Sequence, residues 1–156
     1  MVWSYASIFW DTERSSNSIN MSTRSNIKFI SGKDAFQVYR HSDGYPSAVL
    51  PDLGKFLKWN GSRNSDLSYA VANFIAWSKL GLAIQYGGKQ IEKIFNEPNS
   101  NDYLHLGMGL TQVTKPADMK DSWIEFFYIV DLEKKTVKCY NPTKLIYTVS
   151  FEDSFD

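Results

Sequence analysis

The residues best suited to chemistry lie in one short stretch, Tyr39–Pro46, which contains arginine, histidine, aspartate and two tyrosines around a Gly and a Pro. Histidine is the residue type most often used for proton transfer near neutral pH, and Asp43, two residues after His41, is suited to orient the imidazole or to hold a cation. The guanidinium of Arg40 is suited to clamp an anionic group. We therefore predict a binding site formed by these side chains: Tyr39, Arg40, His41, Asp43 and Tyr45.

The same stretch also has a purely structural interpretation. In it, Asp43 and Gly44 make a turn, the following Tyr-Pro pair packs, and His41 satisfies a backbone carbonyl. Side chains alternate between the two faces of a strand. Tyr39 and His41 are therefore expected on one face and Arg40 on the other. Both interpretations are open at the level of sequence.

His105, the other histidine of the chain, lies in a segment predicted as a strand, with Gly107 and Gly109 on the same face. Glycines in a strand can mark the close approach of a ligand or of another backbone. Convergence of His41, Asp43 and His105 would create a metal or phosphodiesterase-type site. Without such convergence His105 is an exposed side chain on a sheet face, and we predict no metal site and no cofactor.

Two elements must position the stretch. Asn26–Ile30 and Ala35–Arg40 alternate between apolar and polar residues and flank a Ser-Gly-Lys-Asp turn, which predicts a β-hairpin. Apolar residues at helical spacing follow Pro46 and predict a helix with Pro51 in its first turn and a stop at Gly61.

A longer helix is predicted over Ser68–Leu80, capped by Asn64 or Ser65. The pattern then changes to strands, which are expected over Tyr103–Val113, Ser122–Asp131, Thr136–Tyr140 and Leu145–Phe151. This order of elements predicts an α+β fold, a mainly antiparallel sheet with two or three helices packed on one face. We expect residues 21–156 to form a single domain and residues 1–20 to be an N-terminal extension or, over Trp3–Phe9, an edge strand.

Composition excludes several classes of function. The 17 basic and 17 acidic residues cancel, which does not support binding of nucleic acid through phosphate neutralisation and argues against a polybasic membrane anchor. Cys139 is the single cysteine, so no internal disulfide forms. The apolar stretch Val2–Trp10 is too short to span a bilayer and lacks the flanks of a signal peptide. We expect a cytoplasmic protein.

Two segments resemble a family of uncharacterised proteins common in bacteriophage and bacterial genomes. These are Met21–Ile27, with its Met-Ser-Thr-Arg start, and Val38–Pro46, with a Tyr-x-His-x-Asp-Gly-Tyr-Pro motif. The resemblance covers about the first quarter of the chain counted from Met21. It implies a phage or prophage origin and favours Met21 as the ancestral start, and it brings no assigned activity.

Two functional hypotheses are consistent with these residues. The first is a small binding or accessory protein of phage or prophage type that engages an unknown protein or small-molecule partner through Tyr39–Pro46. The alternative is a small hydrolase or nuclease that uses His41 and Asp43 with help from His105. We favour the first, because the chain lacks a second acidic or histidine motif of the kind that metal catalysis needs. The sequence leaves open whether the protein is an enzyme.

Overall fold

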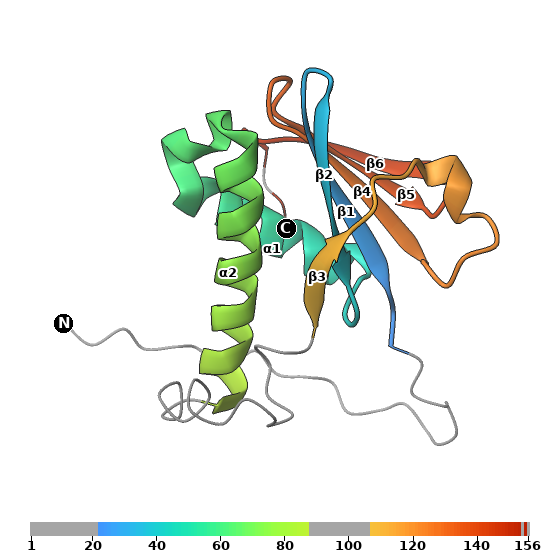
Figure 1. Cartoon of the computed structure of the whole chain (residues 1–156), viewed down its shortest axis with the longest axis horizontal. Helices are drawn as coiled ribbons and strands as arrows, with labels where there is room; N and C mark the ends of the chain where they lie inside the picture. Colours follow the sequence, from blue (N-terminus) through green and yellow to red (C-terminus); the bar gives the residue numbers. More distant parts are fainter. Residues whose placement is uncertain (1–21, 88–106, 154, 156) are drawn as a thin grey trace.

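Six strands form one sheet in the order β3-β2-β1-β4-β5-β6. The structure, a computed structural model, describes residues 22–87, 107–153 and 155 (Figure 1). The strands are β1 (Ser25–Ser31), β2 (Asp34–Arg40), β3 (Met108–Thr111), β4 (Phe126–Asp131), β5 (Thr136–Asn141) and β6 (Lys144–Ser150). Every neighbouring pair is antiparallel except β1 with β4, which is parallel. The predicted α+β class with a mainly antiparallel sheet is confirmed.

The predicted hairpin is β1 and β2, joined by a turn in which Gly32 has φ +58°. That left-handed conformation suits glycine because it lacks a Cβ atom. The register sets Ile27 opposite Val38, and Phe29 belongs to the same face, where all three side chains are fully buried. The alternation seen in the sequence therefore sets which face of the hairpin enters the core.

Two helices and a short 3-10 turn cover this face: α1 (Pro46–Asn60), η1 (Gly61–Ser65) and α2 (Leu67–Gly87) (Figure 1). The Phe74 ring of α2 lies 5.2 Å from Phe29 of the sheet and 5.0 Å from Phe56 of α1, measured between centroids. These three rings are fully buried and join both helices to the sheet. The prediction of helices on one face is confirmed.

The connection between β3 and β4, which contains η2 (Pro116–Met119), packs against polar residues of the other face. The Gln37 side chain donates to Thr114 Oγ1 at 3.0 Å and accepts from Thr114 N at 3.0 Å, and Lys28 Nζ donates to Thr114 O at 3.0 Å. The Asn26 amide contacts Met119 Sδ at 3.5 Å. Gln37 and Asn26 are buried polar residues, and these contacts supply each of them with a hydrogen-bonding partner. This crossing was not predicted, and it brings β4 parallel to β1.

Two details differ from the sequence-based expectations. Pro46, not Pro51, occupies the first turn of α1, and Pro51 lies inside the helix. The cap of α2 is Asp66, whose Oδ1 accepts from Ser68 Oγ at 2.8 Å and from Tyr69 N at 3.3 Å. These hydrogen bonds lower the pKa of Asp66. The Asn64 side chain is not free to cap, since its Nδ2 donates to Leu57 O at 2.7 Å.

Several expectations can be compared with the described residues only in part. Of the strand predicted over Tyr103–Val113, residues 108–111 form β3, and residues 103–106 lie outside the described ranges, as do residues 1–21. The strand predicted from Ser122 begins at Phe126. No helix within 22–87 or 107–153 has the length and apolar character needed to cross a bilayer.

Candidate functional site

The predicted site Tyr39–Pro46 spans the end of β2 and the start of α1, and its middle part, His41–Tyr45, is the corner that joins these two elements. The main-chain N–H of His41 donates to Gly107 O at 2.8 Å, so the pairing with the β3 side extends one residue past the strand. Asp43 then takes a left-handed conformation with φ +53°. Tyr45 returns to extended geometry and precedes the first turn of α1. The turn proposed at Asp43 is therefore present.

Two further segments hold the main chain of this corner. The Ser22 hydroxyl donates to His41 O, and Gly44 N donates to Thr23 O at 3.0 Å. Tyr128 of β4 donates its hydroxyl to Gly44 O at 2.8 Å from a fully buried position. Burial strongly raises the pKa of Tyr128, which keeps the hydroxyl protonated as a donor.

Glycine is required at position 44 because the surrounding backbone leaves no space for a side chain. A Cβ atom added there would lie 2.9 Å from Arg24 C and from the backbone nitrogen and Cβ of Ser25. Such contacts are too short for a backbone to accept without moving. The corner is therefore pressed directly against the beginning of β1, and the glycine of the motif has a steric cause.

Tyr39 and His41 lie on the sheet face opposite the helices, as the alternation predicts. The Tyr39 hydroxyl and His41 Nδ1 are 2.9 Å apart, and the two rings meet edge to face with centroids 6.0 Å apart. His41 is exposed, and its Nε2 forms no hydrogen bond with a described residue. The tyrosine thus orients the imidazole through Nδ1, and no described residue occupies the other ring nitrogen.

Arg40 points to the helical face, where it joins the corner to α1. Its Nη1 lies 2.8 Å from Asp52 Oδ2, and its Nε donates to Ser42 O at 3.0 Å. The Arg40 side chain is 14% exposed and that of Asp52 is 37% exposed. The guanidinium therefore bonds mainly to other groups of the protein, and these contacts show that Arg40 positions the corner.

A small cavity of about 170 Å³ adjoins the corner on the helical side. Arg40, Asp43 and Asp52 contribute its charged groups, and Trp77 of α2 closes part of it. The described lining residues include Asp43 but not His41. Asp43 and His41 thus serve different surfaces of the same corner, and the predicted pairing of imidazole and carboxylate is absent from this cavity.

Of the three predicted catalytic candidates, the structure describes His41 and Asp43, which lie on different surfaces of the corner. His105 lies outside the described ranges, so its position relative to His41 stays a prediction. Within those ranges, no group of three or more His, Cys, Asp and Glu side chains is arranged to hold a metal ion. Cys139 is buried, and its pKa is raised to about 11 by burial, as expected for a packing residue.

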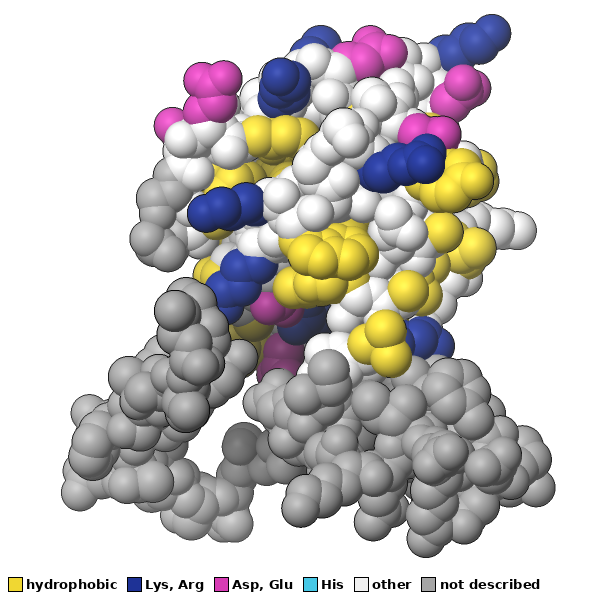
Figure 2. Space-filling model, turned by 90° about the vertical axis from the view of Figure 1, so that its left-hand side faces the viewer, with side chains coloured by type: hydrophobic (Ala, Val, Ile, Leu, Met, Phe, Trp, Pro, Cys, Tyr) yellow, Lys and Arg dark blue, Asp and Glu magenta, His cyan; other side chains and the backbone are white. Residues whose placement is uncertain are grey.

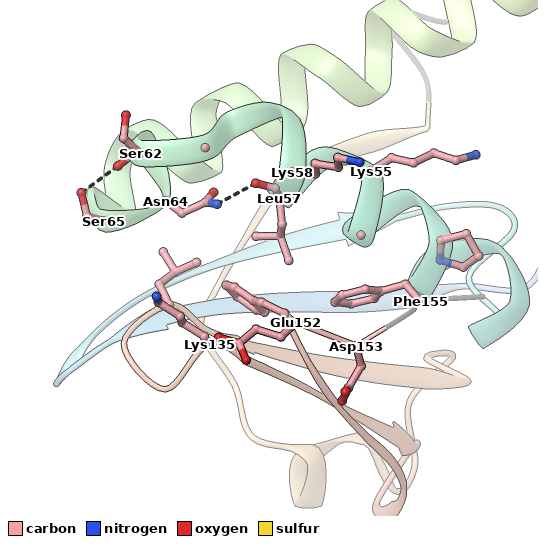
Figure 3. Close-up of a pocket in the computed structure, with 15 residues that line it drawn as sticks. Lys55, Leu57, Lys58, Ser62, Asn64, Ser65, Lys135, Glu152, Asp153 and Phe155 are labelled. Atoms are coloured by element: carbon pink, nitrogen blue, oxygen red, sulfur yellow. Dashed lines mark hydrogen bonds between the residues drawn. The ribbon is translucent and has the colours of Figure 1, made fainter.

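A larger cavity, about 730 Å³, lies away from the corner, between the second half of α1 with η1 and the residues around the β4–β5 turn and after β6 (Figure 3). Sequence reasoning missed it. One signal was available in Gly54, a glycine inside a helix, because a Cβ there would lie 2.7 Å from the Phe155 ring. The close approach of that ring to the helix helps to form the cavity.

The surface also carries isolated apolar side chains. Of two tryptophans on the helices, Trp77 packs against the core and Trp59 is 63% exposed. Viewed from the side of α2, hydrophobic side chains appear between lysine, arginine and acidic side chains (Figure 2). Scattered apolar residues of this kind are normal for protein surfaces and do not by themselves indicate a site.

Comparison of the chain with protein-family models, with curated proteins and with solved structures finds no match.

Proposed function

We propose that this protein is a small binding or accessory protein that engages a protein partner through the corner His41–Tyr45. The observation that carries the proposal is the contrast between a fixed main chain and accessible side chains. The main chain is bonded to Thr23, Gly107 and Tyr128, while His41, Ser42 and Asp43 are exposed. A loop held in this way loses little conformational entropy on binding, which favours recognition.

The distribution of charge on the corner suits a polar partner surface. Asp43 lines the small cavity on the helical side, whereas His41 lies beside Tyr39 on the far face of the sheet. A partner that contacts both must therefore cover the turn. Such a contact uses hydrogen bonds and charge from the corner, with Tyr39 adding an aromatic surface.

The resemblance of Val38–Pro46 to bacteriophage and bacterial proteins supports a phage or prophage origin for this accessory role. Binding through the corner does not depend on that origin.

Site-specific photo-cross-linking tests the proposal in the cell from which the gene comes. A photoreactive p-benzoylphenylalanine at position 43 should yield a discrete cross-linked complex. The matched control is the same group at position 33, since Lys33 is also exposed but lies in the turn at the other end of the hairpin. Equal cross-linking at both positions, or none at position 43, would rule out the corner as the binding surface.

A small hydrolase or nuclease is the second candidate, and the Tyr39–His41 contact is the observation in its favour. The Tyr39 hydroxyl oxygen lies 2.9 Å from Nδ1. When Nδ1–H donates to this oxygen, the ring is held in the tautomer whose Nε2 carries no proton, and Nε2 then acts as a general base. His41→Ala should then abolish turnover of ester or phosphodiester substrates, and Tyr39→Phe should reduce it while both variants stay folded. Activity that survives in His41→Ala would reject this candidate.

A further inference from the structure

The cavity of about 730 Å³ beside α1 has the size of a small-molecule site, for which about 300–1,000 Å³ is typical. Its two walls come from different parts of the chain. One wall is the second half of α1 with η1, and the other is Leu132 and Lys135 together with residues 151–153 and 155. The cavity does not involve the corner, so a ligand bound in it is independent of the function proposed for the corner.

The inner surface of this cavity is apolar. Leu57 of α1 and Leu132 of the β4–β5 turn are buried, and the rings of Phe151 and Phe155 pack against the core. In the close-up, Leu57 projects from α1 toward the opposite wall, and Phe155 lies under the helix (Figure 3). An apolar hollow of this size favours an apolar ligand body, because its surface is removed from water on binding.

The polar groups that belong to the walls are mostly used within the chain. Asn64 Nδ2 donates to Leu57 O at 2.7 Å, and Ser65 Oγ donates to Ser62 O at 2.9 Å. Asp153 Oδ2 accepts from Ser150 N at 2.9 Å, and its side chain points away from the cavity in the close-up (Figure 3). A strongly polar ligand such as a sugar would therefore meet few free partners along these walls.

The lysine side chains that line the cavity, in contrast to its polar wall groups, are not paired with described residues. Lys58 of α1 and Lys135 of the turn belong to opposite walls, and Lys55 lies one helical turn before Lys58. All three are exposed, and none forms an ion pair with a described residue. Glu152 and Asp153 are the acidic residues among the described lining residues, and the Asp153 carboxylate is turned toward Ser150 N. Three ammonium groups against two carboxylates leave a net positive charge along the described walls, which favours an anion.

We infer that this cavity binds an amphipathic carboxylate, an aliphatic or aromatic body with one anionic head, with the body against the leucine and phenylalanine side chains and the head between Lys58 and Lys135. The apolar body supplies most of the binding, and the lysines determine the sign of the head group. Exposed charge pairs contribute modestly in water, so the lysines act mainly in selectivity.

Decanoate is a suitable probe, titrated into the full chain below its micellar concentration and followed by calorimetry and by two-dimensional amide NMR. We expect saturable binding with one decanoate per chain. The amide shifts should change at Lys55, Ser62, Lys135 and Glu152. Decylammonium, which has the same chain and the opposite charge, should bind at least about tenfold more weakly.

The test variant carries both Lys58→Glu and Lys135→Glu. The control variant is Lys33→Glu, which lies on the distant hairpin turn. All three positions are exposed, so the variants should fold. The double variant should lose about tenfold or more in decanoate affinity, and the control should change it by less than about twofold. Phe155→Trp, which enlarges the ring beside Gly54, tests the body of the site and should weaken both probes.

Four results would overturn the inference. The first is an absence of saturable decanoate binding. The second is shifts confined to residues outside the cavity, and the third is equal affinity for decanoate and decylammonium. A second copy of the chain covering this cavity would also overturn it, and would appear as a concentration-dependent molecular mass with the same residues shifted in the absence of probe.

Discussion

Replacing Tyr128 with Phe tests how the core of the sheet holds the corner. The change removes one hydroxyl and leaves the ring in place. That hydroxyl donates to Gly44 O at 2.8 Å, and both residues are buried, so the variant leaves a buried carbonyl without its donor. An unsatisfied buried acceptor costs about 1–3 kcal/mol. For a chain of this size we expect a melting temperature lower by about 3–8 °C.

Urea unfolding followed by tryptophan fluorescence measures this change, and Tyr147→Phe is the matched control. Tyr147 is 52% exposed on β6, and its loss of a hydroxyl should change the free energy of unfolding by less than about 0.5 kcal/mol. Amide exchange at Gly44, whose N–H donates to Thr23 O, should accelerate in Tyr128→Phe. A free energy within about 0.5 kcal/mol of the wild type, or equal effects in the two variants, would refute the role of this hydrogen bond.

Three further changes have expected outcomes. Gly44→Ala should destabilise the protein by about 1–3 kcal/mol in urea unfolding, because the added Cβ would lie 2.9 Å from backbone atoms. Gly81→Ala in α2 is the control and should be neutral or stabilising, because a Cβ there meets nothing within 4 Å. Equal effects of the two substitutions would contradict this explanation. Asp52→Asn should cost about 1 kcal/mol, since it leaves the largely buried Arg40 without its carboxylate, and no change in urea midpoint would count against that ion pair. Burial raises the pKa of the Cys139 thiol from 9.0 to about 11. The unfolded state therefore releases the thiol proton first, and the free energy of unfolding should fall as pH rises from 9 to 11. In Cys139→Ala this fall should be shallower, and an unchanged dependence of stability on pH would disprove the raised pKa.

Much of the fold could be predicted because it depends on local patterns. The alternation in Asn26–Ile30 and Ala35–Arg40 indicated the buried face of a hairpin, since the strand period of two leaves only one face to bury. The helical period over Ser68–Leu80 likewise predicted α2, in which Ala70, Val71 and Phe74 are buried. Turn chemistry located Gly32 and Gly61, both at positive φ. These features need only short-range geometry, which the sequence carries directly.

The candidate site depended on contacts between residues distant in the chain. Sequence placed His41 and Asp43 two residues apart, but the left-handed turn at Asp43 directs them to different surfaces. The role of Gly44 arises from the approach of Ser25, and its carbonyl partner Tyr128 is 84 residues away. The crossing of Thr114 over Gln37 and the cavity beside Phe155 likewise arise from contacts between residues distant in the chain. Sequence alone determined the elements and the motif, whereas packing between distant segments decided which side chains meet, because steric exclusion and buried hydrogen bonds act through space.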